Sequence, residues 1–342
     1  MDSTKRSVAA LAAAAGVALG TLALAATTAA ASGEDTFTVA VVSPSAANDL
    51  AFSQSMIDSL TRMQDAGAID EFVYSENLFV VEDAASALRG YAEDGHDLVI
   101  AHGSQYGGPL QEIAPDFPDT AFAWGTETNT FGLSNVSAYS AASDQGGYVM
   151  GTMAALLAGE GSIGIIGPIE VGDAKLYVDG FHAGVLATNP DATVGVNYTE
   201  SFSDAALAAE AASTFIGGGA TVLTGTAQMT VGAIGVANEE GVLWFGTQSN
   251  QAQLAPDVVV ASQVYHWEVV LGSLVENVRT GTLGGESFEI TLANQGLLVE
   301  HNLEFELPAD VQAAADETIG LLVTGELTTG VGIDSAPATT GA

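Results

Sequence analysis

The sequence predicts an α/β protein made of two doubly wound parallel-sheet lobes. Apolar runs typical of strands alternate with amphipathic runs typical of helices, which indicates βαβ units with helices on both faces of each sheet. About ten such steps are present, too many for one open sheet of ordinary size. A new strand follows Gly159–Gly161, where the second lobe can begin. A closed eight-fold barrel is the alternative, and the high strand count and uneven spacing disfavour it.

The expected elements follow one another along the chain. Helix ends are marked by Gly or Asn-Pro, and Asp or Ser opens several helices. Strands are expected at residues 37–43, 71–77, 97–103, 120–126, 136–140, 162–167, 193–201, 220–227, 241–247, 258–264 and 288–292. Amphipathic helices are expected at residues 51–67, 84–95, 144–159, 177–190, 203–219 and 230–241.

The two ends of the chain differ from the alternating middle. Residues 1–31 indicate an export signal, with Lys5 and Arg6 before an Ala-rich apolar stretch and small residues near Ala31. The alternative is a retained membrane anchor, which the weakly hydrophobic composition disfavours. Residues 331–342 are small and polar and predict a flexible tail.

The charge balance is strongly acidic. The chain has 42 Asp and Glu residues against 6 Lys and Arg, a net charge of −36. Such a field repels nucleic acid and anionic lipid, so neither is an expected partner. It also suggests life in high salt, where screening weakens self-repulsion. There is no cysteine, which excludes disulfides and thiolate chemistry.

Signals of catalysis, metal binding or cofactor binding are missing from the sequence. None of the five histidines has a metal-binding spacing, and no G-x-S-x-G motif or phosphate loop occurs. His102, at the end of an expected strand, is better explained as a structural residue than as a catalytic one. We therefore expect a non-enzyme without a metal or cofactor.

Polar loops follow the expected strands. In doubly wound sheets, ligands bind beyond the carboxyl ends of the strands. Here those ends carry segments such as SPSAAND, HGSQYGG and GTQSNQ, rich in Gly, Ser, Asn and Gln. Polarity alone is ordinary for such loops, but it does not explain Phe52 and Phe202, each at the polar exit of a strand.

An ordered set of motifs runs along the chain. The opening VAVVSPSAANDLAFSQSMIDSL contains an Asn-Asp pair followed closely by Phe-Ser-Gln. Further segments of the set are DLVIAHGSQYGGPL, DQGGYVMGTMAALL, IGIIGP, GFHAGVLATNPDATVGVNYTESFSD and GVLWFGTQSNQ. Together they resemble the basic membrane protein family of transporter substrate-binding proteins, which includes purine nucleoside receptors and has an opening like this one as its hallmark. The similarity runs from about residue 38 to residue 281, with weaker agreement beyond.

The resemblance implies a type 1 periplasmic binding protein fold. In that fold two α/β lobes are joined by a hinge of three crossovers, and the ligand binds in the cleft between them. We expect the first lobe at residues 36–139 plus 250–285, and the second at 140–249 plus 286–330.

The resemblance also implies site residues. Phe52 and Phe202 match a pair of rings that sandwich a flat base; packing in the hinge or core is the alternative for each. Asn48 and Asp49 would bind a base edge, with capping of the next helix as the alternative. Gln248 would make a further polar contact to the ligand, from the second lobe. Weaker candidates are Ser104, Tyr106 and Tyr265.

The sequence differs from the nucleoside receptors at positions whose charged side chains hold the ribose hydroxyls in those receptors. Gln248 stands where they carry an aspartate, with Asn250 at a second acidic position, and Tyr265 stands where they carry a lysine. These differences favour a smaller ligand such as a free nucleobase. The alternative for Tyr265 and Trp267 is hinge packing.

The resulting functional prediction is an extracytoplasmic substrate-binding protein of an ABC importer that captures a purine-like nucleobase or nucleoside. It would be exported, periplasmic or extracellular, and monomeric, with a membrane permease as its partner. One alternative is a ligand sensor for a membrane receptor. Others are a binding protein for another small polar ligand such as a sugar, and a secreted hydrolase, which the missing catalytic motifs disfavour.

Overall fold

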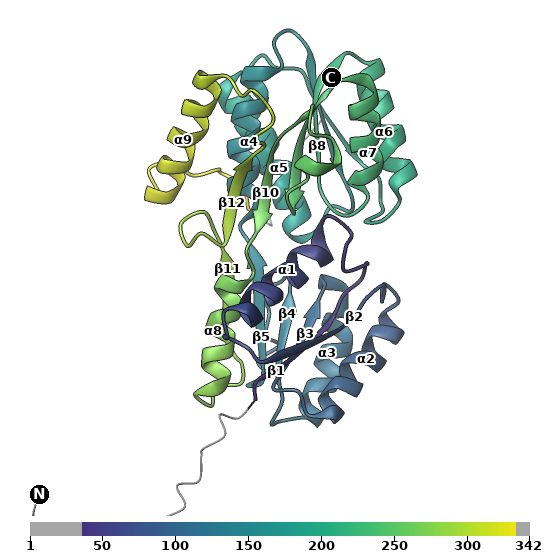
Figure 1. The fold of residues 1–342 in the computed structure, drawn as a ribbon, viewed down its shortest axis with the longest axis vertical. Coiled ribbons are helices and arrows are strands. Elements are labelled where there is room, and N and C mark those ends of the chain that lie inside the picture. Colours follow the sequence, from purple (N-terminus) through teal and green to yellow (C-terminus); the bar gives the residue numbers. More distant parts are fainter. Residues whose placement is uncertain (1–35, 333–342) are drawn as a thin grey trace, which may run out of the picture. The chain divides into compact units, whose positions relative to one another are not determined.

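The computed structural model describes residues 36–332 and contains two six-stranded sheets (Figure 1). The expected export signal (1–31) and most of the expected tail (331–342) lie outside the described residues. In the first sheet all neighbouring strands are parallel. Its order is β11 (Ser287–Ile290), β5 (Val136–Ala141), β4 (Ala121–Gly125), β3 (Leu98–His102), β1 (Thr38–Val42) and β2 (Glu71–Ser75).

The second sheet repeats this plan with one antiparallel edge. Strand β12 runs antiparallel to β10, while the other neighbours are parallel. The order is β12 (Leu297–His301), β10 (Val259–Tyr265), β9 (Leu243–Gln248), β8 (Ala220–Gly225), β6 (Ser162–Gly167) and β7 (Val194–Tyr198). The predicted α/β fold with two doubly wound sheets is confirmed.

Helices cover both faces of each sheet, as Figure 1 shows. Helices α1 and α8 lie on one face of the first sheet and α2 and α3 on the other, while α4, α5 and α9 face α6 and α7 across the second. Their bounds are α1 (Phe52–Asp65), α2 (Val81–Asp94), α3 (Gly107–Ile113), α4 (Ser143–Leu157), α5 (Gly172–Thr188), α6 (Ala205–Gly217), α7 (Thr230–Glu240), α8 (Glu268–Arg279) and α9 (Ala309–Thr324). None of the helices within residues 36–332 is long and apolar enough to cross a bilayer.

The central strands are buried because helices cover both of their faces. Every residue of β3, β4 and β5 is buried, and their sequences are correspondingly rich in apolar and small residues. One continuous apolar core extends from the α1 and α8 face of the first sheet to the α4 and α5 face of the second. The two sheets are therefore joined by packing as well as by the chain.

Three segments of the chain cross between the sheets, after β5, after β10 and after β11. The crossing points correct the expected lobe boundaries for two strands. The sequence places residues 250–285 in the first lobe, but β10 pairs with β9 and β12 in the second sheet. It places residues 286–330 in the second lobe, but β11 pairs with β5 in the first sheet. Pairing between distant strands decides membership, and local sequence patterns do not encode it.

Helices α4 and α5 pack very closely through glycines. A Cβ atom added at Gly151 would overlap the backbone carbonyl of Phe181, and one at Gly184 would overlap that of Tyr148. Only glycine permits this approach of two backbones. The close contact fixes α5, and with it the loop and first helical turn that carry Gly172 and Asp173.

Candidate functional site

A cavity lies at the carboxyl ends of strands from both sheets, the place predicted for a ligand. Its empty space, including the open mouth, is about 480 Å³. Residues from both lobes line it: Pro44, Phe52, Phe79, Gly103, Ser104, Gln105, Thr126, Val171, Gly172, Asp173, Ala174, Phe202, Ala227, Gln228 and Gln248. The lining is mainly apolar with a few hydrogen-bonding groups, the usual character of a small-molecule site.

On the first lobe, Phe52 begins helix α1 and is held by His102 from the end of β3. The two rings are stacked, with centroids 3.9 Å apart and planes 6° apart. His102 Nδ1 lies 2.8 Å from the Tyr139 hydroxyl, and its Nε2 lies 3.2 Å from the Phe52 carbonyl oxygen. Burial lowers the pKa of His102 to about 3, so the imidazole is neutral. His102 thus has the structural role expected of it, and it fixes the orientation of Phe52.

On the second lobe, Phe202 lies in the loop between β7 and α6. The residue is partly exposed, and its carbonyl oxygen accepts a 3.0 Å hydrogen bond from the Met229 amide. The structure therefore brings the two predicted aromatic residues to one cavity, Phe52 on a buried support and Phe202 on a more exposed loop.

Gln248 and Ser104 also lie where the sequence predicted, on the cavity lining. Gln248 ends strand β9, is 3% exposed, and has no hydrogen-bond partner for Oε1 among the described residues. Its φ is +69°, and that of Ala227 in the neighbouring loop is +75°. Non-glycine residues are uncommon in this left-handed region, and such strain often occurs at functional sites.

The other four candidates do not line the cavity. Asp49 caps helix α1: its carboxylate accepts hydrogen bonds from the amides of Ala51, Ser53 and Gln54 at 2.9–3.1 Å. This arrangement is the capping alternative, and it occupies the carboxylate that was expected to bind a base edge. Asn48 is exposed.

Both tyrosines are buried instead of lining the cavity. The Tyr106 hydroxyl donates a 2.8 Å hydrogen bond to the Leu78 carbonyl, so this ring is part of the core. Tyr265 lies behind the cavity lining, and its hydroxyl donates a 3.1 Å hydrogen bond to Asp173 Oδ2. Tyr265 therefore influences the cavity indirectly, by orienting the carboxyl group of Asp173, which lines it.

Asp173, which the sequence did not single out, lines the cavity from the first turn of α5. It is 9% exposed, and burial raises the pKa of its carboxyl, while the hydrogen bond from Tyr265 acts in the opposite direction. In a chain this acidic, one aspartate carries no sequence signal of its own. Phe79, from the loop before α2, is a second lining residue that was not predicted.

The model of the PnrA-like family of ABC transporter substrate-binding proteins matches residues 36–319. The chain belongs to this family. A purine-binding protein of Brucella abortus is 30% identical over 257 residues, covering 75% of this chain and 72% of the relative. The transcriptional activator protein med of Bacillus subtilis is 25% identical, covering 72% and 76% of the two chains.

A solved ABC transporter solute-binding protein from Conexibacter woesei has a similar fold. Its TM-score is 0.72 at 26% identity, covering 86% of this chain and 98% of the other. The chain is thus a substrate-binding protein of the ABC transporter type, whose members bind small molecules outside the cytoplasm and present them to a permease. The resemblance noted in the sequence is confirmed.

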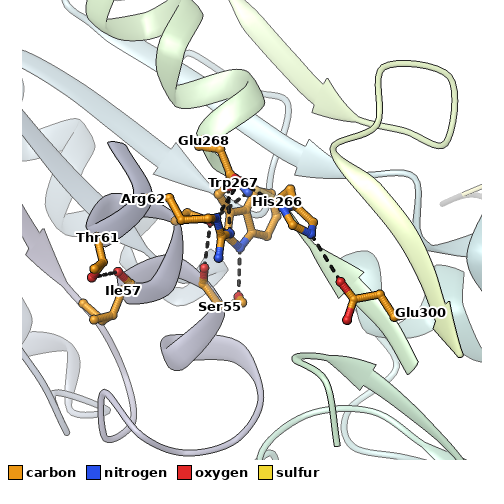
Figure 2. Close-up of polar contacts among 9 residues, drawn as sticks. Ser55, Ile57, Thr61, Arg62, His266, Trp267, Glu268 and Glu300 are labelled. Carbon is orange, nitrogen blue, oxygen red and sulfur yellow. Dashed lines mark hydrogen bonds and ion pairs between the residues drawn. The ribbon is translucent and has the colours of Figure 1, made fainter. Parts of the chain in front are cut away.

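The hinge of this substrate-binding protein carries a group of paired charges, drawn in Figure 2. We call Arg62, His266, Glu268 and Glu300 the hinge cluster. Arg62 of α1 binds both carboxylate oxygens of Glu268 of α8, at 2.7 and 2.9 Å. His266, in the crossover after β10, lies 2.9 Å from Glu268 Oε1 and 3.7 Å from Glu300 Oε1 of β12. The imidazole therefore lies between a carboxylate packed with the first sheet and one in the second.

The electrostatics of the hinge cluster favour its charged forms. The hydrogen bond with Glu268 and the ion pair with Glu300 raise the pKa of His266 to about 9, against the effects of burial and Arg62. Burial alone would raise the pKa of Glu268, but His266 and Arg62 hold it well below its usual range. Next in the chain, Trp267 is fully buried, and its indole N–H donates to the Ser55 hydroxyl at 3.0 Å. Trp267 thus packs in the hinge.

Proposed function

We propose that this substrate-binding protein captures a purine-like nucleobase or nucleoside and presents it to the permease of an ABC importer. The observation that carries the proposal is the meeting of Phe52 and Phe202, from different lobes, at one cavity. A flat heterocycle would stack on such rings, and each stacked ring contributes about 1–3 kcal/mol to binding. The purine-binding relative from Brucella abortus supports this ligand class.

A free base fits the polar groups better than a nucleoside does. Nucleoside receptors of the family carry an aspartate and a lysine where this chain has Gln248 and Tyr265. Tyr265 is buried behind Asp173 and supplies no cation to ribose hydroxyls. We therefore place nucleobases ahead of nucleosides as ligands.

Release to a permease would use the two-lobed architecture. A ligand that contacts both lobes stabilises the closed arrangement because its contacts are complete only there. The permease would then recognise the lobe surfaces of the closed form.

The test is calorimetric titration of the purified protein with adenine, guanine, hypoxanthine, their nucleosides and glucose. We expect purine bases to bind at micromolar or lower concentrations and glucose to leave the heat signal unchanged. Binding of glucose without any base would replace the ligand assignment by the sugar alternative. No binding of any compound would remove the support for a purine-like ligand.

A ligand-sensing role is the second candidate, favoured by the relative named as a transcriptional activator. It uses the same cavity and differs in the partner. Genes for a permease and an ATPase beside this one would favour transport, and deleting such a permease should then abolish uptake of the base. Unchanged uptake after that deletion would favour sensing.

A further inference from the structure

The cavity has a distinctive distribution of hydrogen-bond acceptors and charge. Asp173 is the only ionisable side chain among the described residues that line it. The lining also has three amides and two hydroxyls, those of Gln105, Gln228, Gln248, Ser104 and Thr126. Within residues 36–332, no lysine or arginine contributes to the lining, so a bound anion would face a carboxylate without a compensating cation.

Asp173 is held in place by a short relay of hydrogen bonds. Gln263 Nε2 donates to the Tyr265 hydroxyl at 3.4 Å, and that hydroxyl donates to Asp173 Oδ2 at 3.1 Å. Burial raises the pKa of Tyr265 well above its usual value, so the hydroxyl keeps its proton and remains a donor. The carboxylate is thereby oriented before any ligand arrives, which reduces the entropy lost on binding.

Gln248 has a side-chain oxygen that lacks a hydrogen-bond donor. Its Oε1 is buried without a partner among the described residues, and a buried acceptor left unpaired is destabilising. Because Gln248 lines the cavity, turning its side-chain amide toward the cavity would let a ligand N–H group supply the missing hydrogen bond.

The lysine of the same helix is already paired. Lys175 follows Asp173 by two residues in α5, is 7% exposed, and forms an ion pair with Asp179. It does not line the cavity. The paired lysine leaves Asp173 as the dominant charge that a ligand meets.

We propose that Asp173 determines ligand specificity. Its carboxylate, together with Gln248 Oε1, accepts hydrogen bonds from N–H groups of the bound base. The site then selects bases that carry N–H donors and excludes phosphorylated forms. This inference rests on the proposed function, because it takes the ligand to be a flat base stacked between Phe52 and Phe202.

The experiment is a thermodynamic cycle in which two proteins, wild type and Asp173→Asn, are each titrated with two ligands. Calorimetry measures the four binding affinities. The ligands are adenine and its 9,N6,N6-trimethyl derivative, which keeps the ring system but has no N–H group. Wild-type protein should bind adenine about 10- to 100-fold more tightly, as expected for hydrogen bonds to a charged acceptor. The Asp173→Asn variant should lose most of that preference.

The cycle separates hydrogen bonding from steric effects. Any steric penalty of the extra methyl groups is present in both proteins and cancels in the comparison. Asp144→Asn is the matched control, since Asp144 is a partly buried aspartate in the first turn of α4 that does not line the cavity. It should leave the preference for adenine within about twofold of wild type.

Each outcome distinguishes the inference from the proposed function. If the wild type binds neither adenine nor any other base, the proposed function fails. If bases bind but Asp173→Asn keeps the full preference for adenine, only the role of Asp173 is overturned. Tight binding of adenosine monophosphate would also overturn the role of Asp173.

A second variant serves if Asp173→Asn does not fold, as judged by circular dichroism. The same cycle with Gln248→Met should show a preference for adenine reduced by about threefold or more. An unchanged preference would overturn the inference.

Discussion

The cavity and the hinge cluster use opposite chemistry although two consecutive residues, Tyr265 and His266, serve them. Tyr265 donates a hydrogen bond to Asp173 at the cavity, and none of the described residues lining this cavity is a lysine or an arginine. His266 lies between Glu268 and Glu300, with Arg62 bound to Glu268. The described lining of the cavity thus has one ionisable group, a carboxylate, whereas the hinge cluster consists of paired ions.

The difference between the cavity and the hinge cluster shows where a very acidic chain places its few basic side chains. Arg62, one of only six basic residues in the sequence, is used at the hinge and not at the ligand. Partly buried ion pairs are screened less than exposed ones, so this use survives in salt. An uncharged ligand makes no ion pair that salt could screen, so its affinity would depend little on ionic strength.

The largest expected effect tests the hinge side of this comparison. Glu268→Gln removes the carboxylate that pairs with both Arg62 and His266, leaving two cations next to each other. We expect unfolding to require about 2 kcal/mol less free energy, below the cost of breaking a fully buried pair because Arg62 is 43% exposed, as measured by urea denaturation. The matched control is Glu276→Gln on the exposed side of the same helix, which should change stability by less than about 0.5 kcal/mol. Equal effects of the two substitutions would show that the hinge cluster adds no stability.

The second prediction tests the cavity side with its two aromatic residues. Phe202→Ala should weaken base binding by about 2 kcal/mol, and Phe52→Ala by at least as much. The two variants should differ in stability. Phe52→Ala should lower the melting temperature more than Phe202→Ala does, because Phe52 is stacked on buried His102 whereas Phe202 is partly exposed. Calorimetry and thermal melting measure the two quantities. A large loss of stability in Phe52→Ala with unchanged affinity would make that ring a core residue.

The third prediction uses pH to examine His266. Its pKa is raised from 6.5 to about 9, so the stability from its protonated form is complete below pH 6.5 and is lost as the pH rises through 9. Wild type should therefore exceed His266→Gln by about 1–2 kcal/mol at pH 6, and the excess should decline toward pH 10. Urea denaturation at several pH values measures this. An excess that stays constant from pH 6 to pH 10 would contradict the ionic role.

Much of the fold was predictable because its signals are local. Strands such as β3 and β4 are short, wholly buried apolar runs, and all the expected strands are present. Strand β12 was not predicted, since it is an edge strand with one buried residue and no alternation. The sheet membership of β10 and β11 depends on distant pairing, which local patterns do not reveal.

The site was predictable only in part, for a related reason. Phe52 and Phe202 stand out because aromatic rings are unusual at polar strand ends, and both line the cavity. Asp49 had two open explanations, and the structure shows its capping contacts. Asp173 becomes distinctive only through burial and through Tyr265, which lies 92 positions further along the chain.

The smallest expected effect concerns Tyr265, the residue that links the two regions. Tyr265→Phe removes one hydroxyl and keeps the buried ring, so the hinge packing should persist while Asp173 loses a hydrogen-bond donor. The carboxylate is then less well oriented, and we expect adenine affinity to fall by about 1 kcal/mol, roughly fivefold. The pH dependence of stability due to His266 should remain as in wild type, because His266 is paired with other groups. A loss of that pH dependence in Tyr265→Phe would show that the cavity and the hinge cluster are one coupled unit.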